Sequence, residues 1–412
     1  SASSTNNLSG PTQTDAPGSN PQHAVTVTFV DEVNDDFHLA PTDASAKNNG
    51  TDLSSDPNGF AFTDDIDGQT RSGSWDIGAD EFVNTAPNAP VSLGQYQSGC
   101  SSSISTSTYW IATSTVCFQG VISDSDLYDL EKLQIELSTS TFSNSPNYTA
   151  SSFTTSTATS SANATATSSI TVSSLPDANY KWQSRLLDYS NGTSSFTQFN
   201  SGNNSFGIDI TSPTGTISIP SIMDISTSSI VLGQPATSTI TESGSGLYQW
   251  QIKRGSTELG FISTSTATTS DTGLTPNTQY SYYVQFKDLA GNLSSYSNAT
   301  SVYSQTLDPV NDVDTLNQTS IVITVDVFNN ATSGSSGYYF RNTTASTTSG
   351  WIQTNSWEST GLTCNTPYSF SIKQRNGDGI ESDLTTHNAT TLACSASASA
   401  VANAGLPISI LS

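Results

Sequence analysis

The sequence predicts an all-β protein in which tandem sandwich domains follow a distinct N-terminal segment. Three observations support this prediction. Apolar and polar residues alternate with period two along much of the chain, no 3.6-residue apolar stripe typical of a helix occurs, and one tyrosine-led strand pattern recurs three times. The chain has 412 residues, which is enough for three or four domains of about 100 residues each.

The alternation is clearest in two segments. Val25, Val27 and Phe29 alternate with threonines, and apolar residues alternate in the same way over residues 321–327. Threonine suits the exposed face of a strand because its β-branched side chain is well accommodated on a pleated surface. Both segments are therefore expected to be strands with one buried face.

The repeated pattern occupies residues 175–192, 274–292 and 362–379. In each copy a Leu precedes a short turn, a Tyr follows, an aromatic residue comes two positions later, and a turn-forming Asp or Asn comes eight positions after the Tyr. These residues are Tyr180, Trp182 and Asp188, then Tyr280, Tyr282 and Asp288, and finally Tyr368, Phe370 and Asn376. Each copy predicts a strand that buries aromatic groups and ends in a tight hairpin.

This pattern resembles the tyrosine corner and F–G hairpin of fibronectin type III and immunoglobulin-like modules, particularly those of bacterial surface proteins and secreted enzymes. The resemblance implies that Tyr180, Tyr280 and Tyr368 are structural, each hydroxyl bonding back to the preceding turn. Proline-containing joints divide the chain into an N-terminal segment (1–83), three sandwiches (84–209, 210–306 and 307–394) and a tail (395–412). The tail is expected to be a linker followed by a strand that another subunit could accept.

The N-terminal segment resembles the closing coil of secreted right-handed parallel β-helix proteins of the pectate-lyase-like type. The matched residues are Asp36, His38, Leu39, Pro41, Ala44, Ala46, Gly50, Asp65, Asp67, Gly68, Arg71, Asp76, Ile77, Gly78, Ala79 and Glu81. A coil stack needs at least about three repeats to bury a core. Residues 1–83 are therefore expected to be a cap whose helix was removed, or to dock on the next domain, or to complete a neighbouring subunit.

Charge excludes one class of partner and supports an exported protein. The 11 Lys and Arg against 35 Asp and Glu give a net charge of −24, whereas a nucleic-acid binder needs clustered cations. No apolar run is long enough for a membrane span, and the first residues lack the features of a leader peptide. The sequence therefore predicts a mature extracellular or cell-surface protein with no nucleic-acid partner.

The four cysteines form two sequence-local couples, Cys100 with Cys117 and Cys364 with Cys394. Neither couple has the CxxC spacing typical of zinc or redox sites. We expect two disulfides, as is usual outside the cytoplasm. Four buried thiols are the alternative.

The sequence contains no recognisable catalytic constellation. His23, His38 and His387 are far apart, and none belongs to a nucleophile or zinc-binding motif. In the β-helix lyases and hydrolases that the N-terminal segment resembles, catalysis takes place on middle coils, and this sequence has no counterpart of those coils. We therefore expect a non-enzyme without a catalytic residue.

Acidic turns are the better candidates for a site, and calcium is the ion that would fit them, since it prefers six to eight oxygen ligands. Asp64, Asp65 and Asp67 share a glycine-closed turn, and Asp124, Asp126 and Asp129 lie in a predicted loop. A third group is Asp378, Glu381 and Asp383 in the last hairpin. The alternative is a solvated turn, or an aspartate bonded to Arg71. No other cofactor is expected.

Two features of the sequence could involve sugars: the glycosylation sequons and the exposed aromatic residues. The chain has 74 Ser and 59 Thr, so Asn-x-Ser/Thr sequons such as the one at Asn163 arise by chance and say little about glycosylation. Exposed aromatic residues could stack on a bound polysaccharide, with Trp351 and Trp357 as the best pair. Burial in a sandwich core is the competing interpretation.

These observations favour an extracellular structural or adhesive protein, a subunit of a surface assembly or filament. Self-association is expected through β-strand contacts, because the strand 23–30 offers an edge and the tail 405–412 could pair with it. The alternative is an accessory C-terminal region of a secreted β-helix polysaccharide lyase or hydrolase, with the modules as spacers or carbohydrate binders. A third interpretation is an adhesin whose loops bind a protein ligand.

Overall fold

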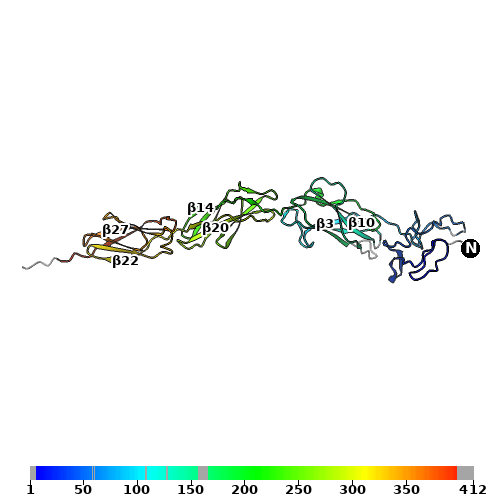
Figure 1. Ribbon diagram of the computed structural model, residues 1–412, viewed down its shortest axis with the longest axis horizontal. Helices are drawn as coiled ribbons and strands as arrows, with labels where there is room; N and C mark the ends of the chain where they lie inside the picture. Colours follow the sequence, from blue (N-terminus) through cyan, green and yellow to red (C-terminus); the bar gives the residue numbers. More distant parts are fainter. Residues whose placement is uncertain are drawn as a thin grey trace, which may run out of the picture. The chain divides into compact units, whose positions relative to one another are not determined.

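The computed structural model describes residues 6–57, 59, 61–106, 109–126, 129–155 and 166–396. The chain divides into two compact units. The first comprises residues 1–211 with the loop segments 243–245 and 290–292, and the second comprises the rest. Strands dominate both units, as the coloured ribbon in Figure 1 shows, and the helical elements among the described residues are two short 3-10 turns. Within the described residues, no helix is long and apolar enough to cross a membrane.

The first sandwich, in the first unit, packs a three-stranded sheet on a larger one. The smaller sheet has the order β3 (Val91–Gln97), β5 (Val116–Ile122), β9 (Ala166–Val172). The larger sheet runs β4 (Trp110–Ile111), β12 (Phe206–Ile208), β10 (Ala178–Asp188), β6 (Leu130–Ser138), β7 (Tyr148–Thr149), with β11 (Thr197–Gln198) on β10 and β8 (Thr154–Thr155) on β6. The core between the sheets includes Phe118, Leu133 and Trp182.

The second sandwich lies in the second unit. Its three-stranded sheet has the order β14 (Ser221–Ile225), β15 (Ser229–Gly233), β19 (Thr268–Thr272). Its four-stranded sheet runs β18 (Thr257–Ser263), β17 (Leu247–Arg254), β20 (Gln279–Asp288), β21 (Thr300–Tyr303), and a separate small pair joins β13 (Thr214–Gly215) to β16 (Ile240–Thr241). Trp250, Tyr282 and Phe286 fill the core.

The third sandwich repeats the three-plus-four arrangement in the same unit. One sheet has the order β22 (Asn311–Leu316), β23 (Ser320–Val325), β26 (Ser356–Thr360), and the other runs β25 (Thr347–Ile352), β24 (Gly337–Asn342), β27 (Pro367–Arg375), β28 (Thr385–Thr390). In a fibronectin type III module, one sheet holds strands A, B and E, and the other holds strands C′, C, F and G. The two sheets of the third sandwich have this order. The predicted fold class, tandem all-β sandwiches of this kind, is confirmed.

The three tyrosine-led strands are β10, β20 and β27. The hydroxyl of Tyr180 donates to the carbonyl of Pro176, whereas those of Tyr280 and Tyr368 accept from the backbone N–H groups of Thr275 and Thr363. Each hydroxyl therefore ties its strand to the turn that precedes it. The hairpins that follow need one left-handed residue each, and these are Asn191, Gly291 and Gly379.

The N-terminal segment has little regular structure. Its only strand pair among residues 6–83 that the structure describes is antiparallel, β1 (Phe29–Asp31) with β2 (Asp36–Leu39), joined by the turn η1 (Glu32–Asn34). The parallel contact among its described residues is the isolated bridge between Leu8 and Gln22, so these residues do not form the stacked coil that the resemblance implied. The segment is instead fixed by buried Arg71, whose guanidinium donates to the carbonyls of Gly78 and Ala79 and pairs with Glu81 at 3.3 Å.

Two disulfides join the cysteines in the couples expected from the sequence. Cys100 and Cys117 have Cα atoms 5.3 Å apart, and Cys364 and Cys394 have Cα atoms 5.1 Å apart. The second bond links the turn before β27 to the segment after β28, which are antiparallel neighbours.

Removing the Cys364–Cys394 bond is expected to destabilise the third sandwich. The bond closes a loop with a sequence separation of 30 residues, and a loop of this size corresponds to about 3 to 4 kcal/mol on the chain-entropy model. Urea unfolding of a Cys364→Ser, Cys394→Ser double variant measures the loss. Unchanged stability, or free thiols in non-reducing peptide maps of the native chain, would contradict the prediction.

A buried polar joint connects the second and third sandwiches inside the second unit. Asn277, in the turn before β20, is fully buried, and its amide donates to the carbonyls of Asn329 and Asn330 and to the hydroxyl of Ser336. Its side-chain oxygen accepts from the N–H of Gly377 at 2.9 Å. Every polar atom of this side chain is thus used by the next module.

The joint has a second amide on the other module. Asn376, at the end of β27, donates from its side chain to the carbonyls of Tyr303 and Ser304, which follow β21. Its side-chain oxygen accepts from the N–H groups of Asp378 and Ile380 in its own hairpin. The two modules are therefore bonded in both directions by side-chain amides.

Candidate functional site

Three carboxylates converge at one end of the first sandwich, and we call Asp124, Asp129 and Asp188 the acidic corner. Asp124 follows β5, Asp129 precedes β6, and Asp188 ends β10, so neighbouring strand ends bring them together. One oxygen of each lies within 4.8 Å of the others. Asp129 and Asp188 are buried, and Asp124 is half-buried. This is an arrangement of oxygen atoms that a divalent cation could bridge.

Each carboxylate of the acidic corner also serves the local backbone. Asp124 accepts from the N–H of Asp126 at 3.0 Å, and Asp129 accepts from the N–H of Leu130 at 2.7 Å. Asp188 accepts from the N–H of Gly192 and, through its second oxygen, from the side-chain amide of Asn84. Asn84 comes from the joint before the sandwich, so the corner ties that joint to the F–G hairpin.

Burial dominates the electrostatics of the acidic corner. It raises the pKa of Asp129 to about 6, and it also raises the pKa of Asp124. Carboxylates this close repel one another when all are ionised, so a shared proton or a bound cation lowers the free energy of the folded state.

The sequence candidates and this geometry overlap only in part. Asp124 and Asp129 meet, but the carboxylate of Asp126 turns to the N–H of Thr85 at 2.6 Å. Asp188 was not among the predicted ligands, although it occupies the repeated position eight residues after Tyr180. That repeated offset is the signal that could have identified it.

Calcium binding at the acidic corner stays a prediction, and its stoichiometry can be measured. Asp188→Asn is expected to remove one calcium equivalent in isothermal titration calorimetry, because an amide supplies one neutral oxygen in place of a charged carboxylate. The third sandwich has Asn376 at the equivalent position, so the variant should fold. Asp224→Asn, at an exposed position of β14, is the matched control. The same stoichiometry in both variants would show that the corner holds protons and no calcium.

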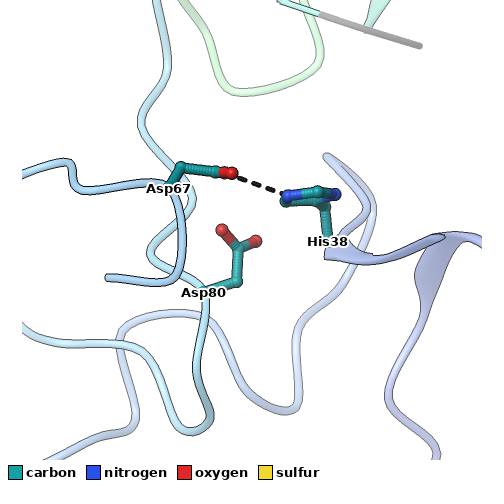
Figure 2. A group of neighbouring side chains, drawn as sticks. All are labelled: His38, Asp67 and Asp80. Carbon is teal, nitrogen blue, oxygen red and sulfur yellow. Dashed lines mark ion pairs between the residues drawn. The ribbon is translucent and has the colours of Figure 1, made fainter.

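The N-terminal candidates Asp65 and Asp67 separate in the structure. Asp65 closes its own turn by accepting from the N–H groups of Asp67 and Gln69. Asp67 points instead to His38, whose Nε2 lies 3.0 Å from the carboxylate, while Asp80 lies beside the pair (Figure 2). The opposite ring nitrogen of His38 contacts Asp36 at 2.5 Å.

His38 therefore bridges two carboxylates, one at each ring nitrogen, which is the arrangement that favours a protonated imidazolium. These groups line a cavity of about 390 Å³ that reaches Ser125 and Asp126 of the first sandwich. Asp80 is buried and accepts from the backbone N–H of Leu39 at 2.7 Å. The arrangement holds β2 against the turn that contains Asp67, which is a structural task.

The hydrogen bond to Asp36, with a further contribution from Asp67, raises the pKa of His38 above 6.5. A raised pKa means that the ion pairs stabilise the fold fully below the unfolded value and that this contribution disappears as the pH rises through the folded value. NMR titration of the His38 ring should give a midpoint above 6.5, lower in Asp67→Asn and lower still in Asp36→Asn. An equal midpoint in all three proteins would contradict the prediction.

The acidic group of the last hairpin does not gather at one point. Asp378 accepts from the N–H of Tyr303, Glu381 pairs with Lys373 at 2.8 Å, and the N–H of Asp383 donates to Asp308. The three residues therefore do not form one cation site.

The two candidate platform tryptophans lie on different sheets of the third sandwich, Trp357 on an inner face and Trp351 on an outer face. Trp357 packs against the core of the third sandwich, where its ring contacts Phe340 and Phe370. Trp351, on β25, lies on the outer face of the other sheet, with its ring centroid 5.4 Å from that of Tyr339. The candidate Trp351–Trp357 pair does not form, because β26 belongs to the opposite sheet and turns Trp357 inward; for Trp357 the competing interpretation, packing on the core, holds.

Comparisons with known proteins give partial matches. No protein-family profile matches the chain. A stretch of 186 residues, 42% of the chain, is 33% identical to Exoglucanase B of Cellulomonas fimi. It spans 16% of that protein, so the similarity concerns a small part of the relative. A stretch of this length exceeds the N-terminal segment and must include sandwich residues.

Three solved structures show low similarity to the chain. The FN1–FN3 domains of chicken CNTN1 match with 14% identity over 74% of this chain and all of that one, at a TM-score of 0.25. Two fibronectin type III domains of chicken tenascin match with 13% identity, covering 42% of this chain and 99% of that one, at 0.28. A family 28 exopolygalacturonase of Yersinia enterocolitica matches with 19% identity, covering 23% and 21%, at 0.19. The fold assignment therefore rests on strand order.

Proposed function

We propose that this chain is a non-catalytic accessory region of an extracellular polysaccharide-acting protein, in which the sandwiches act as spacers and carbohydrate binders. The observation that supports this most directly is the 33% identity to part of Exoglucanase B over 186 residues. The two disulfides agree with an oxidising location. His38 and the three repeated tyrosines have structural partners, as expected of spacer modules.

A second candidate, a subunit of a surface assembly, is favoured by a different observation. In the N-terminal segment an apolar cavity of about 710 Å³ is lined by residues that include Phe29, Phe37 and Ile66. Phe37 and Ile66 are exposed, and an apolar surface next to a two-stranded sheet can accept a further strand. The predicted donor, residues 405–412, lies outside the described residues.

The intact mass of the native secreted material separates the two candidates. A covalent product that carries a catalytic domain in addition to this 43.2 kDa chain supports the accessory role. Particles built from repeated copies of the chain alone support the assembly.

The chain itself is expected to release no reducing ends from pectin, alginate or cellulose. Turnover that a single substitution abolishes would overturn the non-catalytic assignment.

A further inference from the structure

The few cations of this acidic chain are concentrated on one type of surface. The chain has 11 Lys and Arg residues. Eight of them lie at outward-facing positions of the two central strands of the larger sheets, which are β6 and β10, β17 and β20, and β24 and β27. These eight positions alternate with core residues. They are Lys132, Lys181, Arg185, Lys253, Lys287, Arg341, Lys373 and Arg375. Each sandwich therefore presents positive charge on the outer face of its larger sheet.

In the first two sandwiches these cations already cover aromatic rings. Lys132 lies 4.1 Å from the ring centroid of Phe153, Arg185 lies 5.1 Å from that of Phe196, and Lys287 lies 4.0 Å from that of Phe261. Such pairs satisfy both the charge and the ring. These faces have internal partners and need no ligand to explain them.

In the third sandwich Arg375 likewise stacks on Trp351, 4.5 Å from its ring centroid, but Arg341 differs. This side chain is exposed, and among the described residues it makes no hydrogen bond, ion pair or ring contact. It lines a cleft of about 360 Å³ together with Tyr339, Trp351, Lys373 and Glu381. We call this the Trp351 cleft.

The strand register builds the Trp351 cleft from adjacent rows. Trp351, Tyr339 and Lys373 are direct cross-strand neighbours on β25, β24 and β27, so they form one row across the sheet. Arg341 stands two residues after Tyr339 on the same face, opposite Ser371. Two tilted rings thus lie beside Arg341 and beside Lys373, which pairs with Glu381 at 2.8 Å, on strands whose other face is packed into the core.

This combination matches a sugar that carries a carboxylate. The electron-rich faces of the Trp and Tyr rings attract the C–H groups on the flat face of a pyranose. Arginine binds a carboxylate with two parallel hydrogen bonds, which assigns the carboxylate to Arg341. Ser371 can exchange hydrogen bonds with sugar hydroxyls, while Glu381 pairs with Lys373 at the edge of the cleft.

We infer that the Trp351 cleft binds polysaccharides that contain uronic acid residues. The inference deepens the proposed accessory role by naming the class of polymer. Because the rings and cations belong to the outer face, substitutions there should leave the core intact.

Isothermal titration calorimetry with trigalacturonate and trimannuronate tests the inference on the full chain. The probes are compared with the same trisaccharides after reduction of their carboxylates to alcohols. Saturable binding of at least one uronate is expected, weakened about tenfold or more by Trp351→Ala and by carboxylate reduction, and about tenfold by Arg341→Ala. Binding should also weaken as NaCl rises from about 50 to 500 mM.

Matched controls are Tyr248→Ala, an exposed aromatic residue of the second sandwich, and Arg185→Ala, a cation stacked on Phe196. Both should bind like the unmodified chain. Equal affinity for the reduced probes, unchanged affinity in Arg341→Ala, or no binding of either uronate would each overturn the inference. The accessory role is decided separately by the intact mass, so either can fail alone.

Discussion

Replacing Trp182 with alanine is expected to destabilise the first sandwich by about 3 to 5 kcal/mol, the range for a fully buried aromatic residue. The Trp182 ring is inaccessible to solvent and contacts the rings of Phe118 and Phe199 at 4.9 and 5.0 Å. Its indole N–H donates to the side-chain oxygen of buried Gln95, so the variant leaves both a cavity and an unsatisfied amide. Urea denaturation followed by circular dichroism measures the loss.

Trp351→Ala is the matched control, since it removes the same side chain from an outer face. It should change the free energy of unfolding by less than about 1 kcal/mol. Comparable losses in the two variants would show that Trp182 does not organise the core.

The second large effect is expected at the joint between the second and third sandwiches. Asn277 has a left-handed φ of 45°, which glycine adopts without strain, so Asn277→Gly removes the amide alone. The variant leaves the carbonyls of Asn329 and Asn330 and the N–H of Gly377 without this partner. A loss of about 3 kcal/mol in coupling between the modules follows from unsatisfied buried groups.

Differential scanning calorimetry measures this coupling. The second and third sandwiches should melt together in the unmodified chain and in separate transitions in the variant. The control is Asn365→Gly, at the equivalent turn of the third sandwich, where the residue has a φ of 54° and is exposed. Separate transitions in the control as well would mean that the turn conformation, and not the buried amide, couples the modules.

The sandwiches were predictable because period-two alternation and turn residues are local signals. The aromatic residues that follow Tyr180, Tyr280 and Tyr368 at a fixed offset are all buried, since a strand that packs on one face must alternate. The cysteine couples were predictable for a related reason: their short separations leave few alternatives.

Long-range features were not predictable in the same way. The approach of Asp188 to Asp124 and Asp129 depends on which loops share one end of a sandwich. The inward position of Trp357 depends on which sheet its strand joins. Alternation says that a strand has two faces, but it does not say which of them another sheet covers. The N-terminal segment was the least predictable part, because it is held by single contacts between distant residues, such as that of Asp80 with the N–H of Leu39, which no periodic pattern indicates.

The joint made by Asn277 and Asn376 affects how a ligand on the third sandwich would be oriented. Asn277 and Asn376 hold the two modules through amide and backbone groups, beside one carboxylate contact from Asp378 to the N–H of Tyr303. The hydrogen bonds between uncharged groups persist across the salt range that would alter ion pairs. If the third module binds a polymer as inferred above, the joint limits how that polymer can turn relative to the second module, so little orientational entropy would remain to be lost when both modules contact one surface. The free energy that couples the two modules should therefore change little with ionic strength.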